Sequence, residues 1–204
     1  MLLRIDKDKP DQNRLSKVID CLKNDGVIIY PTDTVYTLGA SIHSKKAFER
    51  ICKIKNVEPK KSNFSIVCYD LSHISDFTLN LDTPTFKLMK RTLPGPYTYI
   101  LKANKNIPSF FGYNKKTIGI RVPDSNITRE IISMLGAPIF SASIKHDDTI
   151  LEYMTDAEEI YEMYKDKVDI VIDGESCANM ASTIIDCSES EPILIREGLG
   201  EIPF

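Results

Sequence analysis

Short apolar runs alternate with amphipathic helical segments along this whole chain, and this alternation restricts the fold more than any other feature of the sequence. A short run rich in β-branched and aromatic residues, stopped by a proline or a polar turn, is typical of a buried strand. The predicted strands cover 27–30, 64–69, 97–102, 117–122, 139–143, 168–172, 182–186 and 193–196. Strands interleaved with helices indicate an α/β sheet with crossover connections, and short hairpins make that sheet mixed.

Apolar residues at helical spacing predict helices between these strands. The first helix begins after Asp11, which can cap it, and ends just before Gly26. A helix that starts near Pro84 is predicted to carry Phe86, Met89 and Leu93. Thr155 begins a capping box ahead of the last helix. The other two helices are predicted at 44–55 and at 127–135.

Length and composition limit the class of protein. The 204 residues contain no repeat or linker, which predicts one domain over 1–204. No apolar run approaches the roughly 18 residues that span a bilayer, and the start lacks a signal peptide, so we expect a cytoplasmic protein without a membrane partner. The five scattered cysteines predict buried thiols, and no metal site is expected. The net charge of −3 argues against a protein that coats nucleic acid, although lysines crowd two short regions, 45–61 and 102–116.

The segment 31–36 directly follows a predicted buried strand, where ligands of open α/β sheets tend to bind. The hydroxyls of Thr32 and Thr34 flank the carboxylate of Asp33, and such a group can grip both ends of a small amino acid. A turn capped by its own side chains is the alternative.

Strand alternation places a polar face beside an apolar one in several predicted strands. In 117–122, Arg121 lies on the face opposite to the isoleucines, and in 139–143 Ser141 and Ser143 lie opposite to Phe140 and Ala142. Arg196 repeats the arrangement, with Thr183 nearby. A buried arginine needs either an anionic ligand or a carboxylate in a structural ion pair, and both alternatives stay open. Polar faces on several strands indicate a sheet that curves around a polar cavity.

Several motifs occur together in one order. They are Pro-Thr-Asp-Thr-Val-Tyr-Thr-Leu-Gly at 31–39, Leu-Pro-Gly-Pro at 93–96, Thr-Ile-Gly-Ile-Arg-Val-Pro at 117–123, Ser-Ala-Ser at 141–143 and Ile-Arg-Glu-Gly at 195–198. In this combination, from about residue 10 to the end, the chain resembles the YrdC/YciO family. The resemblance implies a twisted, mixed α/β sheet with flanking helices around a large open cavity.

The characterised enzymes of that family are nucleotidyltransferases that condense threonine, bicarbonate and ATP into threonylcarbamoyl-adenylate, releasing pyrophosphate, for the t6A modification of tRNA. The resemblance implies ATP as a substrate, with Mg²⁺, and it implies no particular catalytic residue. By position, the threonine site would contain Thr32, Thr34, Arg121 and Thr183. The nucleotide site would contain Lys55, Asn63, Ser141, Ser143 and Arg196.

Two departures from the family pattern favour the YciO branch. Val57 stands where the synthases carry the arginine of a Lys-x-Arg pair, and Lys145 replaces the asparagine of a Ser-x-Asn triplet. Loss of these donors predicts a synthase slower by a factor on the order of 10² or more. Three interpretations stay open: a slow synthase, an enzyme that uses a related amino acid or nucleotide, and a module that binds tRNA, double-stranded RNA or the ribosome.

Overall fold

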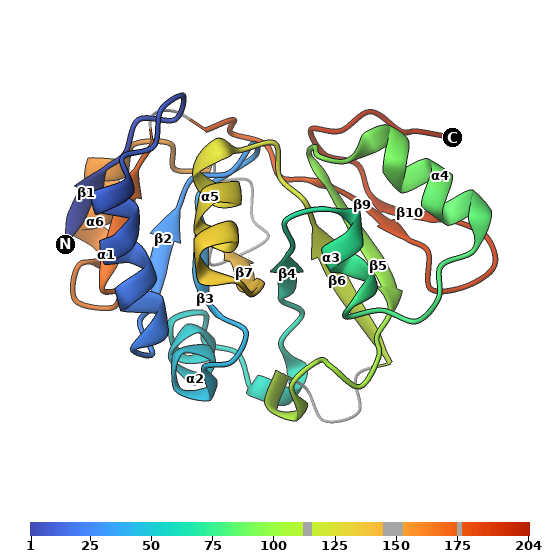
Figure 1. Ribbon diagram of the computed structural model, residues 1–204, viewed down its shortest axis with the longest axis horizontal. Coiled ribbons are helices and arrows are strands. Elements are labelled where there is room, and N and C mark those ends of the chain that lie inside the picture. The colour runs from blue at the N-terminus through green and yellow to red at the C-terminus, as the bar shows by residue number, and fades with distance from the viewer. Residues whose placement is uncertain (112–115, 145–152, 175–176) are drawn as a thin grey trace.

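The computed structural model describes residues 1–111, 116–144, 153–174 and 177–204. Its strands form one ten-stranded sheet in the order β1-β8-β2-β3-β7-β4-β6-β5-β9-β10 (Figure 1). The strands are β1 (Leu2–Arg4), β2 (Ile28–Tyr30), β3 (Thr37–Ser41), β4 (Ser65–Val67), β5 (Tyr97–Lys102), β6 (Thr117–Arg121), β7 (Ile139–Ser143), β8 (Ile170–Asp173), β9 (Thr183–Asp186) and β10 (Ile193–Arg196). The helices are α1 (Gln12–Lys23), α2 (Lys45–Ile54), α3 (Leu71–Ser75), α4 (Thr83–Thr92), α5 (Asn126–Leu135) and α6 (Ala157–Tyr164).

The sheet is mixed, as the sequence predicts. Hairpins join β2 to β3, β5 to β6 and β9 to β10 in antiparallel pairs. Crossovers make β1 and β2 parallel to β8, β4 parallel to β6, and β5 parallel to β9. The pairings connect segments far apart in the sequence, because β1 at the start of the chain pairs with β8 near its end.

Helices cover both faces of the sheet. α1 and α5 lie side by side over β2 and β7 (Figure 1), where they bury aliphatic residues such as Leu15 and Ile131 against Ile28 and Ile139. α2 and α6 bury their apolar residues in a larger cluster on the opposite face, and that cluster contains Phe140. Successive residues of one strand therefore enter different cores. None of the described helices is both long and apolar enough to cross a membrane.

The N-terminal caps follow local side-chain chemistry. Asp11 caps α1 as predicted and accepts a hydrogen bond from the backbone N–H of Arg14. The last helix is capped by Asp156, not by Thr155, since the Asp156 carboxylate accepts from two backbone N–H groups in the first turn. α4 starts one residue before Pro84, after the cap Asp82.

Other differences come from tertiary packing. Phe86 of α4 is 44% exposed, whereas Thr85 and Met89 of the same helix are buried. Among the described residues, two strands and one α-helix were not predicted, namely β1, β3 and α3. β3 was missed because all five of its residues are buried, which hides the alternation that marks a half-buried strand.

Candidate functional site

A polar cavity of about 270 Å³ opens on the sheet face that α1 and α5 partly cover. Its wall comes from the loop after β2 and from strands β3 to β7, β9 and β10, so segments distant in sequence meet there. The polar lining residues are Thr34, Thr37, Lys55, Asn63, Ser65, Thr98, Arg121, Ser141, Ser143, Ser182 and Arg196.

Strand alternation explains why polar groups gather on this face. Ile139 packs in the α1–α5 cluster, so Ser141 and Ser143 point to the same side farther along β7, beyond the helices. In β6, Gly119 leaves room for the floor of the cavity. A Cβ atom there would lie 2.8 Å from the Ser65 hydroxyl oxygen and 3.4 Å from a Thr98 methyl carbon.

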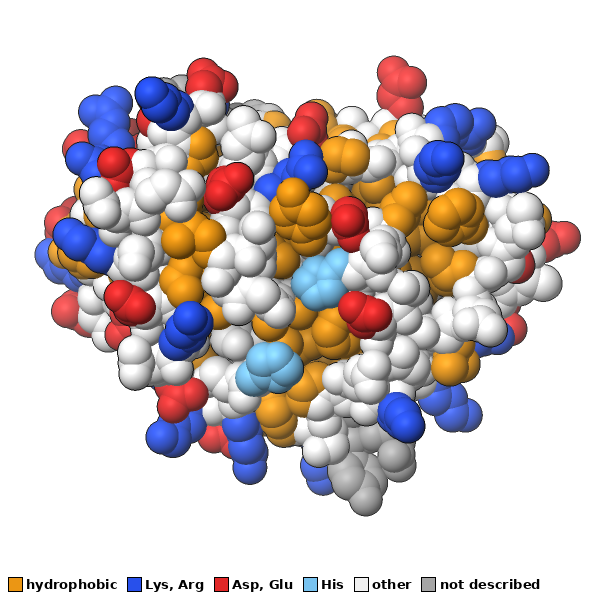
Figure 2. Space-filling view, viewed as in Figure 1, with side chains coloured by type: hydrophobic (Ala, Val, Ile, Leu, Met, Phe, Trp, Pro, Cys, Tyr) orange, Lys and Arg blue, Asp and Glu red, His pale blue; other side chains and the backbone are white. Residues whose placement is uncertain are grey.

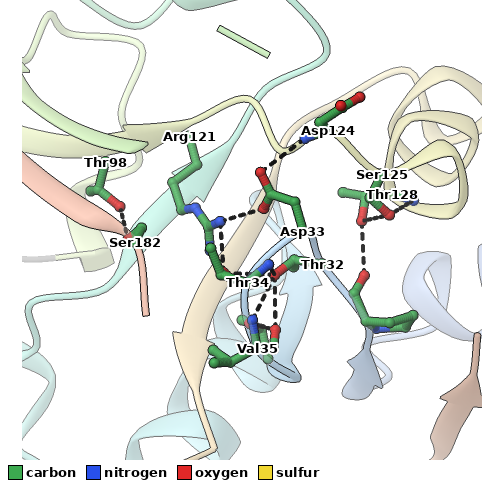
Figure 3. Close-up of polar contacts among 12 residues, drawn as sticks. Thr32, Asp33, Thr34, Val35, Thr98, Arg121, Asp124, Ser125, Thr128 and Ser182 are labelled. Carbon is green, nitrogen blue, oxygen red and sulfur yellow. Dashed lines mark hydrogen bonds and ion pairs between the residues drawn. The ribbon is translucent and has the colours of Figure 1, made fainter. Parts of the chain in front are cut away.

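Arg121 forms a buried ion pair at the inner end of the cavity (Figure 3). Its Nη2 atom donates to Asp33 Oδ1 at 2.8 Å and to Thr34 Oγ1 at 2.9 Å. The second oxygen of Asp33 accepts from the backbone N–H of Asp124 at 3.1 Å. Arg121 therefore has features of both alternatives. It forms a structural ion pair with a carboxylate, and it also lines the cavity where an anionic ligand could bind.

Burial raises the pKa of the Asp33 carboxyl above its ordinary value, and the Arg121 charge offsets part of that rise. The Asp124 backbone N–H acts in the same direction as Arg121. The ion pair thus offsets part of the cost of burying the Asp33 carboxylate, and it fixes the guanidinium in place.

Thr32 does not line the cavity. Its hydroxyl donates to the Val35 carbonyl at 2.8 Å and accepts from the backbone N–H groups of Thr34 and Val35. Thr32 lines a neighbouring hollow of about 350 Å³ instead. The structural alternative, a turn capped by its own side chains, describes Thr32. The predicted direct contact of Thr32 with a ligand in the cavity does not fit this geometry.

Thr183 is also misplaced by the sequence analysis. It is fully buried on the far side of β9, where its hydroxyl donates to the Gly200 carbonyl at 2.5 Å and accepts from the Gly198 N–H at 3.0 Å. Its neighbour Ser182 faces the cavity instead and bonds to Thr98 at 2.7 Å (Figure 3). Ser182, and not Thr183, therefore lines the cavity.

The remaining predicted residues all reach the cavity: Thr34, Lys55, Asn63, Arg121, Ser141, Ser143 and Arg196. Lys55 Nζ donates to the Ser143 carbonyl at 2.8 Å, which holds the ammonium group against the end of β7. Arg196 donates to the Ser182 carbonyl from Nε and Nη2, at 3.2 and 2.7 Å. Their binding roles stay predictions.

The cavity is cationic. Lys55, Arg121 and Arg196 line it, and no carboxylate does so among the described residues, because Asp33 lies behind Arg121. Serine and threonine hydroxyls can donate or accept, so they suit a ligand that carries both anionic and neutral polar groups.

Several lining residues were not singled out from the sequence, among them Ser65, Thr98 and Ser182. Thr98 sits between two tyrosines in a strand that was predicted, so alternation was the available signal for it. Ser65 is the first residue of β4, and Ser182 directly precedes β9. At the start of such short strands, pairing with the partner strand decides on which face of the sheet a side chain lies.

The two departures from the family pattern have different outcomes. Val57 lies partly buried against the core and is absent from the cavity lining. Its backbone N–H donates to the Cys52 carbonyl at 2.9 Å, and Asn56 has a positive φ of 52°, so the pair ends α2 in a Schellman-type motif. Lys145 lies outside the described residues.

The family model Sua5_yciO_yrdC, described as "Telomere recombination", matches residues 20–198 of this chain. The chain belongs to the Sua5/YciO/YrdC family. The family resemblance predicted from the motifs is thereby confirmed, together with the mixed α/β fold.

The chain is similar to YciO of Escherichia coli K12, with 37% identity over 202 residues, which cover 98% of this chain and 97% of that protein. The crystal structure of E. coli YciO matches with a TM-score of 0.92 and 36% identity, covering 100% and 98% of the two chains. The expected likeness to YciO is therefore confirmed in sequence and structure.

Synthase relatives are also found. A putative threonylcarbamoyl-AMP synthase of Methanocaldococcus jannaschii is 34% identical over 194 residues, 93% of this chain and 89% of that protein. The crystal structure of Pyrococcus abyssi Sua5 complexed with L-threonine has a TM-score of 0.88 at 23% identity. It covers 97% of this chain and 57% of the Sua5 chain, and at that identity it supports the shared fold.

Proposed function

We propose that this Sua5/YciO/YrdC protein binds ATP and L-threonine in the cavity and forms threonylcarbamoyl-adenylate slowly, with release of pyrophosphate. The observation that carries the proposal is the cationic lining, with Lys55, Arg121 and Arg196 among hydroxyls and no described carboxylate. A relative 34% identical to this chain bears the name "Putative threonylcarbamoyl-AMP synthase", which agrees with that chemistry.

The reaction needs two new bonds. The threonine amine must bond to the carbon of bicarbonate, with loss of water, and an oxygen of the resulting carbamate must attack the α-phosphorus as pyrophosphate leaves. We assign Lys55 and Arg196 to the phosphates and Arg121 to the threonine carboxylate, because charge-assisted bonds to such oxygens are the strong ones. The main contribution of the chain is then positioning and charge stabilisation.

Mg²⁺ belongs to the substrate in this proposal. Proteins usually hold Mg²⁺ through one or two carboxylates together with substrate phosphates. The described cavity lining has no carboxylate for a resident ion, so the ion would enter on ATP.

The RNA-binding alternative has weaker support. Much of the lysine-rich stretch on and after α2 is paired with acids: Lys45 lies 3.8 Å from Glu49 and Lys61 lies 3.1 Å from Glu58. On the face shown in Figure 2, basic and acidic side chains are interspersed along the rim. Such a surface offers few free cations to a phosphate backbone.

Pyrophosphate release from ATP tests the proposal directly. We expect slow release that depends on both threonine and bicarbonate. Release that requires another amino acid or nucleotide would support an enzyme of different specificity. Absence of release, together with tight binding to double-stranded RNA that weakens steeply with salt, would support the RNA module.

Gly119→Ala provides the matched variant for this test. Its added methyl group would enter the cavity floor between Ser65 and Thr98, so we expect ATP binding about 10-fold weaker, or about 1.4 kcal/mol. Gly136→Ala is the control. Gly136 has a φ of 69° and open space around it, so alanine there strains the end of α5 without entering the cavity. Calorimetry with ATP should separate the two variants.

A further inference from the structure

Two buried polar atoms next to the cavity lack a hydrogen-bond partner among the described residues: the Tyr30 hydroxyl and Arg121 Nε. Buried polar groups in native proteins nearly always have partners, so each exception needs an explanation. Arg121 lines the cavity, and its Nη2 already donates to Asp33 and Thr34. Nε is therefore a buried guanidinium nitrogen without a hydrogen-bond partner among the described residues.

Tyr30 reaches the same region from two strands away. It lies on β2, and its ring crosses the next strand at Gly39, where an added Cβ would stand 2.6 Å from a ring carbon. Gly39 pairs with Ser141 of β7, which lines the cavity. Because Gly39 has no side chain, the Tyr30 ring can extend across β3 toward Ser141.

The pKa of Tyr30 supports this placement. Burial raises it to about 12, while the Ser141 hydroxyl and the Arg121 charge lower it in part. The phenol is therefore a proton donor near neutral pH, and Ser141 is near enough to act on it. No bond of normal hydrogen-bond geometry joins the Tyr30 hydroxyl to the described residues in the ligand-free protein.

A serine hydroxyl has one proton and two acceptor positions. If Tyr30 donates to the Ser141 oxygen, the proton of the serine hydroxyl is free to point into the cavity. The hydrogen bond from Tyr30 then polarises the serine hydroxyl. Arg121 Nε supplies a second, charged donor in the same region. Two such donors suit a small anionic group with two oxygens on one carbon, because charge-assisted hydrogen bonds are the strong ones.

We propose that Tyr30 is a positioning residue, which orients the Ser141 hydroxyl toward a carboxylate or bicarbonate oxygen that Arg121 Nε also binds. The inference deepens the proposed function, since threonine and bicarbonate are its two carboxyl-type substrates. Tyr30 does not line the cavity, so it acts on the ligand through Ser141.

Tyr30→Phe tests the proposal, with Tyr164→Phe as the control. Both hydroxyls are buried, but the Tyr164 hydroxyl donates to the Ile144 carbonyl at 2.8 Å. We expect Tyr30→Phe to keep or raise the midpoint of thermal unfolding, because it removes a buried hydroxyl that has no hydrogen-bond partner among the described residues. It should weaken binding of the oxyanion about 3- to 10-fold, the usual effect of one hydrogen bond. Tyr164→Phe should lower the midpoint and leave binding unchanged.

Calorimetry with L-threonine and sodium bicarbonate, each added alone, identifies the source of the oxyanion. Weaker binding of either one by Tyr30→Phe supports the inference, even when no pyrophosphate is formed and the proposed synthase reaction fails. Equal binding by Tyr30→Phe and the native protein would overturn it. The inference is also overturned if the native protein binds neither probe, or if Tyr30→Phe unfolds as early as Tyr164→Phe.

Discussion

At the scale of single residues, the Asp33–Arg121 pair dominates the site. Only 7% of the Arg121 side chain and 9% of the Asp33 side chain are exposed. Removing one partner of such a pair leaves an uncompensated charge in the interior, which commonly costs about 3–5 kcal/mol. The pair therefore links the stability of the protein to the geometry of its cavity.

Arg121→Ala should lower the free energy of unfolding by about 3–5 kcal/mol at neutral pH, because the Asp33 carboxylate would stay buried without its counter-charge. Urea denaturation measures the loss. Arg121→Ala combined with Asp33→Asn should recover part of the loss, and a double variant less stable than Arg121→Ala alone would contradict the ion-pair explanation.

The pH dependence of that variant follows from the raised pKa of Asp33. Its folded pKa lies above the ordinary value of 3.8, so the folded state binds the proton more readily than the unfolded state. Stability contributed by this group is then greatest at low pH and falls as pH rises through the folded pKa. Without Arg121 the pKa rises further, so the penalty of Arg121→Ala should shrink as pH falls toward 4. The urea midpoints of Arg121→Ala and the native protein at several pH values test this pH dependence. Asp33→Asn should remove it.

At the scale of elements, the end of α2 separates this chain from the intact synthase pattern. Asn56 adopts a left-handed conformation and Val57 then packs partly buried against the core. An arginine at position 57 would lose that apolar contact, and position 57 does not line the cavity. An arginine restored at position 57 alone is therefore not expected to restore synthase activity.

Val57→Arg should lower the free energy of unfolding by about 1 kcal/mol, since an aliphatic contact typical of this helix end is lost. Pyrophosphate release should not rise. Asn56→Gly is the companion change, and it should stabilise the helix end by up to about 1 kcal/mol because glycine adopts positive φ freely. A rise in pyrophosphate release by Val57→Arg would show that residue 57 reaches the phosphates after all.

At the scale of the whole molecule, the last residues close the sheet behind the cavity. Gly198 and Gly200 both bond to the buried Thr183, and the Tyr97 hydroxyl donates to the Glu201 carbonyl at 3.0 Å. Gly200 also packs closely on the Tyr97 ring. The C-terminal segment thus supports β5 and β9, whose other faces carry Thr98 and, next to β9, Ser182.

A chain that ends at residue 196 should unfold at a lower temperature and bind ATP more weakly, because the Thr183 hydroxyl would lose its bonds to Gly198 and Gly200. A chain that ends at residue 201 keeps these bonds and the Tyr97 contact, so it should behave like the full chain. Differential scanning calorimetry with and without ATP compares the two. If both shortened chains lost thermal stability and ATP binding equally, then the exposed terminal residues, and not the Thr183 contacts, would support the cavity.

The sequence by itself determined the elements with strong local signals and the face that each of their residues takes. Strands β5, β7 and β10 have the predicted bounds, and alternation within β6 and β7 placed Arg121, Ser141 and Ser143 on the cavity side. Family motifs placed Lys55 and Asn63 there. These predictions hold because side-chain direction in a strand has a period of two, which is a local property.

Only the tertiary structure decided which residues meet. The pairing of β9 with β5 turned Ser182 to the cavity and Thr183 away from it. The ion pair of Arg121 with Asp33 joins residues 88 positions apart, and the reach of Tyr30 toward Ser141 depends on Gly39 of the strand between them. Strand order and register are long-range properties of the whole sheet, and for that reason no local pattern in the sequence contains them.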